Sequence, residues 1–308
     1  MPDSLGLESQ AALEEAADEL ARLDEICTLV PASAPRILWL LTVAELTDPR
    51  PELLHALVAA EGDSFHDAAL SPPALLWRDL ITDQERRTRG GAFLSTTRFT
   101  ELVPALATYA ERGRLEAIWR ESGCARPVLV RALDSAAWWP SGTEQAHADA
   151  GDLTAALLLC GGGRTDRIRV LPFAGIPAET RTAALHAWRA GDQEPWALLA
   201  LAAAAHRARE RREGLRRVHA MREREEVTLG SMGRAGISAR RALDALRTFL
   251  AMSMPALAEE LELSRPATAA ALERLTAAGL LREVTARARD RVYAYAPAVA
   301  LAESVLAS

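Results

Sequence analysis

The chain has 308 residues, of which nearly half are apolar and a quarter are charged, so its composition excludes a disordered chain and its length favours two domains. Its longest apolar stretch, residues 196–205, is shorter than the about 20 residues that cross a bilayer, and its three scattered cysteines indicate neither a disulfide framework nor a zinc site, so we expect a cytosolic protein with no membrane contact, metal or cofactor. The net charge of −6 is unevenly divided, because residues 1–205 hold 18 Arg and 29 acidic residues, whereas residues 206–241 hold 11 Arg and 5.

The first half of the chain is predicted to be helical. Apolar residues recur at helical spacing over residues 8–27, which predicts an amphipathic helix. The same signal predicts helices over residues 38–46, 51–60, 73–80 and 100–121 and a buried helix over residues 153–160. Residues 125–163 are otherwise irregular, and residues 168–173 form a short extended run.

Two prolines mark the next helices. Pro177 opens a helix that extends to Arg189, and Pro195 opens a long helix that runs toward Glu226. The long helix becomes strongly charged over residues 206–226, which favours a solvated face with ion pairs between successive turns; a phosphate contact or a dimer helix are the alternatives.

The glycine-rich run 228–236 is the best linker candidate in the chain, because three glycines within seven residues oppose a helix. We therefore expect a helical body over residues 1–232 and a second domain over residues 238–308.

The second domain begins with three predicted helices. A helix over residues 239–250 carries one apolar face, a short helix starts at Pro255, and Ser264 caps a third helix that ends at Gly279. In the third helix, residues 267, 271, 272 and 275 are expected to point inward. The outward set is Arg265, Thr268, Ala269 and Glu273.

After Gly279 the pattern changes to β, with two short strands around the tip 286–290. Helix, helix, tight turn, helix and basic hairpin is the order of a winged helix-turn-helix, whose third helix enters the major groove of double-stranded DNA. We therefore expect a mainly α protein that binds DNA in a sequence-specific manner as a transcriptional regulator. A homodimer is expected, because one recognition helix contacts too few base pairs for useful specificity.

Eight residues are the candidates for DNA contacts. Arg265, Thr268 and Ala269 are expected at base edges, and the backbone contacts are assigned to Ser264, Arg274, Arg287, Arg289 and Arg291. All cationic side chains other than histidine are arginines, whose planar guanidinium suits phosphate and guanine.

The same stretch resembles the C-terminal winged helices of Fic-family proteins and of related bacterial regulators. The resemblance lies in residues 263–268 (LSRPAT) and 275–295, above all 278–285 (AGLLREVT) and 289–293 (RDRVY). Residues 152–226 are weakly similar to the region that follows the active-site helix of Fic proteins, through 171–173 (LPF), 188–189 (WR) and 191–196 (GDQEPW). The resemblance implies a group of bacterial proteins in which a degenerate Fic-like body precedes a helix-turn-helix.

Fic enzymes transfer AMP or a related group to a hydroxyl with a histidine base and a Gly-Asn-Gly-Arg anion cradle. Residues 161–164 (GGGR) are superficially similar to that cradle, but Ala156 stands at the histidine position and Gly162 at the asparagine position. We therefore expect no enzyme activity, because the base is missing. A Fic-like transferase is the less favoured alternative.

A protein-interaction or dimerisation module is the other alternative, because winged helices also serve that role. The acidic residues Glu259, Glu260 and Glu262 on the second helix favour it, and the acidic body offers a surface for a protein partner.

Overall fold

The computed structural model describes residues 5–30, 34, 37–38, 41, 127–138, 151–152, 154–156, 158–159, 170–233, 236–285 and 291–306. These residues are mainly helical and include one small three-stranded sheet, which confirms the expectation of a mainly α protein. The helices predicted at 51–60, 73–80 and 100–121, and most of the one at 38–46, lie outside them. No helix in the described ranges has both the length and the apolar character needed to cross a membrane.

Contacts divide the chain into two compact units. The first unit comprises Met1–Glu25 with Leu75–Arg212, and the second unit comprises Ile26–Ala74 with Glu213–Ser308. The helix α10 (Glu194–Ser231) therefore contributes its first part to one unit and its last 19 residues, Glu213 to Ser231, to the other.

The first unit is built from α1 (Leu7–Leu29) up to Glu25, α7 (Val128–Trp138), α9 (Ala178–Arg189) and the start of α10. The predicted helices at both prolines and at the N-terminus are confirmed, and Pro177 is the N-cap of α9. The prediction of an irregular segment is wrong for α7, whose residues 129, 132, 133 and 136 form a buried stripe at helical spacing. Residues 172–175 form a turn, so the predicted extended run ends earlier than expected.

Trp196 is the centre of the first unit's core. Its ring is fully buried, its Nε1 donates a hydrogen bond to the Leu133 carbonyl oxygen at 3.2 Å, and the edge of Phe173 meets it at a centroid distance of 5.6 Å. The guanidinium of Arg181 lies 5.7 Å from the same ring. The start of α10 is therefore fixed to α7 and α9 by one aromatic side chain.

A buried ion pair lies beside this tryptophan. Both terminal nitrogens of Arg181 donate to the two carboxylate oxygens of Asp152, at 2.7 and 3.0 Å, and both side chains are less than a tenth exposed. Burial raises the pKa of the Asp152 carboxyl, and the charge and hydrogen bonds of Arg181 oppose that rise. The pair is almost completely removed from bulk water, so its two hydrogen bonds replace solvent contacts of the carboxylate.

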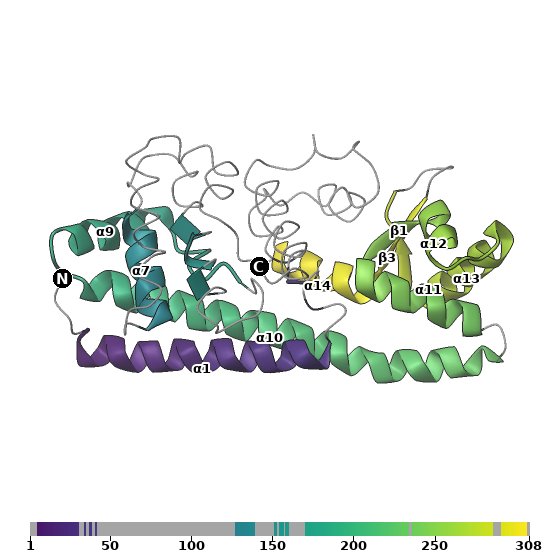
Figure 1. The fold of residues 1–308 in the computed structure, drawn as a ribbon, viewed down its shortest axis with the longest axis horizontal. Coiled ribbons are helices and arrows are strands. Elements are labelled where there is room, and N and C mark those ends of the chain that lie inside the picture. The colour runs from purple at the N-terminus through teal and green to yellow at the C-terminus, as the bar shows by residue number, and fades with distance from the viewer. Residues whose placement is uncertain are drawn as a thin grey trace. The chain divides into compact units, whose positions relative to one another are not determined.

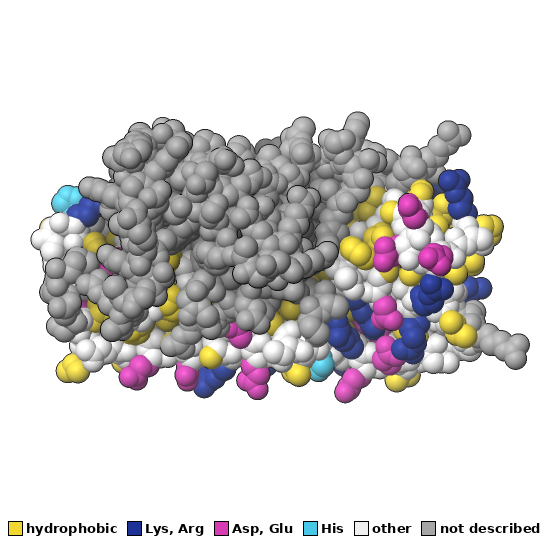
Figure 2. Space-filling model, viewed as in Figure 1, with side chains coloured by type: hydrophobic (Ala, Val, Ile, Leu, Met, Phe, Trp, Pro, Cys, Tyr) yellow, Lys and Arg dark blue, Asp and Glu magenta, His cyan; other side chains and the backbone are white. Residues whose placement is uncertain are grey.

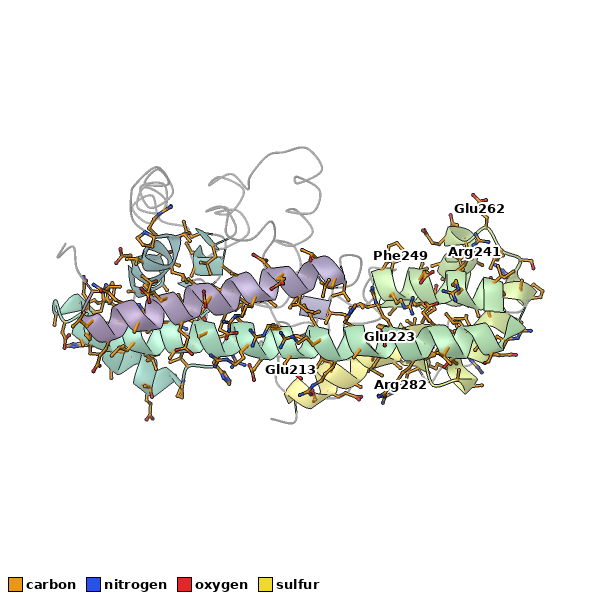
Figure 3. The ribbon with its side chains drawn as sticks, turned by 90° about the horizontal axis from the view of Figure 1, so that it is seen from below. Glu213, Glu223, Arg241, Phe249, Glu262 and Arg282 are labelled. Atoms are coloured by element: carbon orange, nitrogen blue, oxygen red, sulfur yellow. The ribbon has the colours of Figure 1, made fainter. Side chains whose placement is uncertain are left out.

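Helices α1 and α10 lie side by side in the first unit (Figures 1 and 3), and carboxylates attach one to the other. Glu194 accepts hydrogen bonds from the backbone N–H groups of Gly6 and Ser9 at 3.1 and 3.3 Å, which satisfies free donors at the start of α1. Farther along, the buried carboxylate of Glu19 pairs with Arg212 at 2.7 Å and with Arg22 at 3.0 Å. Some of the charged side chains of α1 and α10 therefore pair with each other inside the first unit.

The second unit contains α11 (Gly236–Phe249), β1 (Ala251–Ser253), α12 (Met254–Glu260), α13 (Arg265–Ala277), β2 (Leu281–Glu283), β3 (Val292–Tyr295) and α14 (Ala296–Leu306), as Figure 1 shows. Its sheet is antiparallel with the order β1-β3-β2. The three predicted helices and the two predicted strands are confirmed. The sequence did not predict β1, which is too short for a period, or α14, which is apolar on most sides.

The glycine-rich run does not behave as an extended linker along its whole length. Helix α10 continues through Gly230 to Ser231, five residues past the expected end at Glu226, and α11 begins at Gly236. A single glycine costs a helix only about 1 kcal/mol, and the burial of Leu229 offsets that cost. The backbone at Gly236 lies against this helix, where an added Cβ would be 2.6 Å from the Leu229 carbonyl oxygen.

The ion pair in the first unit gives a direct test of its core. Asp152→Asn removes one charge without changing the side-chain size, so the buried Arg181 loses the carboxylate with which it forms two hydrogen bonds. Breaking a buried pair in this way typically costs about 3–5 kcal/mol. We expect a clear fall in the midpoint of thermal unfolding by circular dichroism.

The matched control is Asp18→Asn, whose carboxylate pairs with Arg22 in a position that is 72% exposed. An exposed pair contributes about 0–1 kcal/mol, so this midpoint should hardly move. Equal effects of the two substitutions would contradict the structural role of the buried pair.

Candidate nucleic-acid interface

Helix α13 begins with the expected cap. Ser264 has an extended backbone, its hydroxyl accepts a hydrogen bond from the backbone N–H of Ala267 at 3.4 Å, and Pro266 occupies the first turn. The cap places Ser264 and Arg265 at the exposed start of the helix.

The inner face of α13 differs from the prediction at one candidate residue. Thr268 is fully buried together with Ala271, Leu272 and Leu275, and its hydroxyl donates to the Ser264 carbonyl oxygen at 3.2 Å. The prediction that Thr268 points outward is therefore wrong. A threonine can occupy a core position in a helix because the carbonyl four residues earlier satisfies its hydroxyl.

The outer face of α13 carries a sparse set of polar groups. Arg265, Glu273 and Arg274 are exposed, and Ala269 is half-buried between them. None of these three charged side chains forms an ion pair with any residue that the structure describes. Two cations and one carboxylate on this surface therefore remain available to a ligand.

A two-stranded hairpin follows α13. Gly279 ends the helix in the left-handed region, with φ of 72°, and the Leu280 N–H returns to the Leu275 carbonyl oxygen. Strands β2 and β3 pair from Leu281 with Tyr295 to Glu283 with Tyr293, and their arms continue to a hydrogen bond between Val292 and Thr285. Arg291 is about half exposed and lies 3.6 Å from Glu283. The candidates Arg287 and Arg289 lie outside the described residues.

A buried cluster around Glu225 connects α10 to this assembly. The Glu225 carboxylate, which is 2% exposed, accepts hydrogen bonds from the Tyr295 hydroxyl at 2.7 Å and from Arg247 at 2.5 and 3.1 Å. Burial and the Glu225 charge raise the pKa of the Tyr295 phenol, which therefore remains a donor. Helix α10, helix α11 and strand β3 meet at this one carboxylate.

Several other described cations of the second unit bind groups of the fold itself. Arg240 pairs with Glu226, Arg282 pairs with Glu303 at 2.6 Å, and Arg241 donates to the Leu261 carbonyl oxygen at 2.6 Å. Figure 3 shows Arg241 near Glu262, which follows α12, and Figure 2 shows cationic and acidic side chains side by side on this part of the surface. Unlike Arg240 and Arg282, Arg265 and Arg274 on α13 have no ion-pair partner among the described residues.

No family model matches this chain, and a search of curated proteins found no match. The fold and its side chains are therefore the basis for any functional proposal.

The residues that the resemblance to Fic proteins singled out do not assemble a described site. Ala156, at the position of the Fic histidine, is buried in a helical segment, and residues 161–164 lie outside the described residues. Within the described ranges, no three His, Cys, Asp or Glu side chains gather in a way that could hold a metal ion.

The sequence did not indicate the Glu225 cluster, because residues 206–226 were expected to form a solvated face. That expectation holds for Arg217, which pairs with Glu213 one turn earlier. It is wrong for Glu225 and for Arg211, which are both buried. The available signal was the position of Glu225 on the same helical face as Val218 and Leu229, both of which are buried.

Tyr295→Phe tests the cluster. The variant removes one donor from a buried carboxylate, so the free energy of unfolding should fall by about 1–2 kcal/mol at neutral pH. The phenol of the folded protein has a raised pKa, so its contribution is present below the unfolded value of about 10 and is lost as pH rises above it.

Urea unfolding at pH 7 and at pH above 10 measures both effects. The wild type should lose stability in the alkaline range, and Tyr295→Phe should lose less. Tyr293→Phe, a half-buried tyrosine on the same strand, is the control and should keep the alkaline loss. An unchanged stability of Tyr295→Phe at pH 7 would contradict the role of the cluster.

Proposed function

We propose that residues 236–306 form a winged helix and that the protein binds double-stranded DNA as a transcriptional regulator. The observation that carries the proposal is the order of the elements: helix α11, short strand β1, helix α12, capped helix α13 and the hairpin of β2 and β3. Strand β1 pairs with β3 and so completes the sheet. In a winged helix with this order, α13 would be the recognition helix and the loop between β2 and β3 would be the wing.

The distribution of charge on α13 supports DNA as the partner. Arg265 begins the outer face and Arg274 lies on its flank, and neither forms an ion pair with a described residue. An exposed cation that is not engaged in the fold can release counterions from a phosphate backbone when it binds. Arg291 at the base of the hairpin is also about half exposed, and it lies 3.6 Å from Glu283.

The proposal includes a homodimer on the DNA. Helix α13 has 13 residues, which span about 20 Å at 1.5 Å per residue, so its base contacts are limited to a few base pairs. Two copies on adjacent half-sites would supply the specificity that a regulator needs.

The test is a fluorescence-anisotropy titration of the full chain with the DNA upstream of its own gene, at two salt concentrations and with competitor duplex. Sequence-specific binding predicts a complex that survives competitor. Salt-sensitive binding without preference would limit the proposal to a nonspecific DNA-binding protein, and the absence of binding would overturn it.

Arg274→Ala should weaken binding to every duplex by a similar factor, because the residue is assigned to the backbone. The slope of log affinity against log salt should fall by about 1, the value of one phosphate contact. Arg217→Ala is the matched control, since it is an exposed helical arginine that already pairs with Glu213. A salt slope that is the same in both variants would remove Arg274 from the interface.

The wing gives a separate prediction. The double variant Arg287→Ala with Arg289→Ala should weaken binding to all sequences and flatten the salt dependence by about two phosphate contacts. The titration at two salt concentrations measures this effect. If the slope stays at the wild-type value, the hairpin loop does not contact the DNA.

A protein-interaction module is the second candidate. Glu259, Glu260 and Glu262 are all exposed at the end of α12, and this acidic group would face a basic partner better than a phosphate backbone. A stable complex with a protein, together with the absence of DNA affinity, would favour this candidate.

A further inference from the structure

We propose that the outer face of α13 recognises bases through Arg265, Ala269 and Glu273, which contact a guanine, a thymine methyl group and a cytosine amino group, respectively. The inference rests on the proposed function and deepens it, because it states which base pairs the recognition helix selects. Arg274 lies on the flank of this face, and we assign it to a contact with the phosphate backbone.

The spacing of the three side chains fits consecutive positions along a major groove. They are four residues apart, so they lie on one face of the helix. At 1.5 Å per residue, successive side chains are separated by about 6 Å and the outer two by about 12 Å. With about 3.4 Å between base pairs along each strand, the set spans about three to four base pairs.

The two charged ends of this face are available because the fold does not use them. Arg265 is exposed in the first turn, and its planar guanidinium matches the two acceptors, O6 and N7, that guanine presents in the major groove. Glu273 is exposed two turns later and forms no hydrogen bond or ion pair with a described residue. A carboxylate can only accept, and cytosine presents a donor, the N4 amino group, at the floor of the major groove.

Glu273 also discriminates by repulsion. An unpaired carboxylate beside DNA phosphates opposes binding at every sequence, and a cytosine donor is the contact that compensates it. Replacement of this carboxylate by an amide removes the repulsion and provides a donor as well as an acceptor. Glutamine forms its bidentate pair with adenine. The same position should therefore change its preferred base from cytosine to adenine.

Ala269 determines how closely the helix approaches the bases. It is half-buried between Arg265 and Glu273 and has a methyl side chain with no polar group. A small apolar side chain at this position lets the helix lie deep in the groove, where it can contact the C5 methyl group of thymine. Deoxyuridine lacks only this methyl group, so it isolates the contact.

The experiment selects preferred duplexes from a randomised library with the full chain and with Glu273→Gln. The wild type should enrich sites with a guanine and a cytosine about three to four base pairs apart. The variant should enrich adenine in place of cytosine at one position per half-site and bind the original site at least about fivefold more weakly relative to the new one. Glu260→Gln, an exposed carboxylate on α12, is the control and should keep the wild-type preference.

Two further measurements test the other contacts. Arg265→Ala should lose the preference for guanine at its position alone, and thymine replaced by deoxyuridine between the two positions should weaken wild-type binding severalfold. If Glu273→Gln keeps the cytosine and strengthens binding to all duplexes equally, the base assignment is overturned while DNA binding stands. If the wild type binds no duplex, both the assignment and the proposed function fail.

Discussion

The carboxylate of Glu225 is the interaction on which the second unit depends. A carboxylate removed from water costs several kcal/mol unless donors replace the lost solvent, and here Arg247 and Tyr295 supply three hydrogen bonds from two separate elements. Because α11 and β3 both hold this carboxylate, the end of α10 is part of the same core. The position of α13 depends on that of α11, because the two helices pack directly on each other.

The net negative charge of the chain is compatible with a DNA-binding surface, because many of its charged side chains pair with each other. Several described arginines form ion pairs within the protein, such as Arg212 of α10 with Glu19 and Arg282 of β2 with Glu303. A cation that already has a carboxylate partner contributes less to binding through phosphates. Any useful affinity would therefore depend on a fitting sequence, and low affinity for competing DNA favours a high specificity ratio.

The sequence predicted elements that have a strong local signal. Pro177, Ser264 and Gly279 marked helix ends correctly because each acts through its own backbone or side chain. Local signals failed for Thr268, which has a polar side chain in a core position, and for α14, which lacks a polar face. Helical periodicity could have indicated that Glu225 is buried, but not which residues it binds, since its hydrogen bonds join residues 22 and 70 positions apart. Helical periodicity alone was enough to predict that Arg265 and Glu273 lie on the outer face of α13.

The position of Gly233 has a practical consequence for studies of protein fragments. A protease cut at Gly233, just after α10 ends at Ser231, would leave Glu225 on one piece of the chain and both of its partners, Arg247 and Tyr295, on the other. The buried hydrogen bonds across the cut, together with Gly214 packed against Leu301, would hold the two pieces as one noncovalent complex. A fragment that begins after the cut would instead bury the Arg247 charge without Glu225, so an autonomous C-terminal fragment has to include α10 from about residue 213.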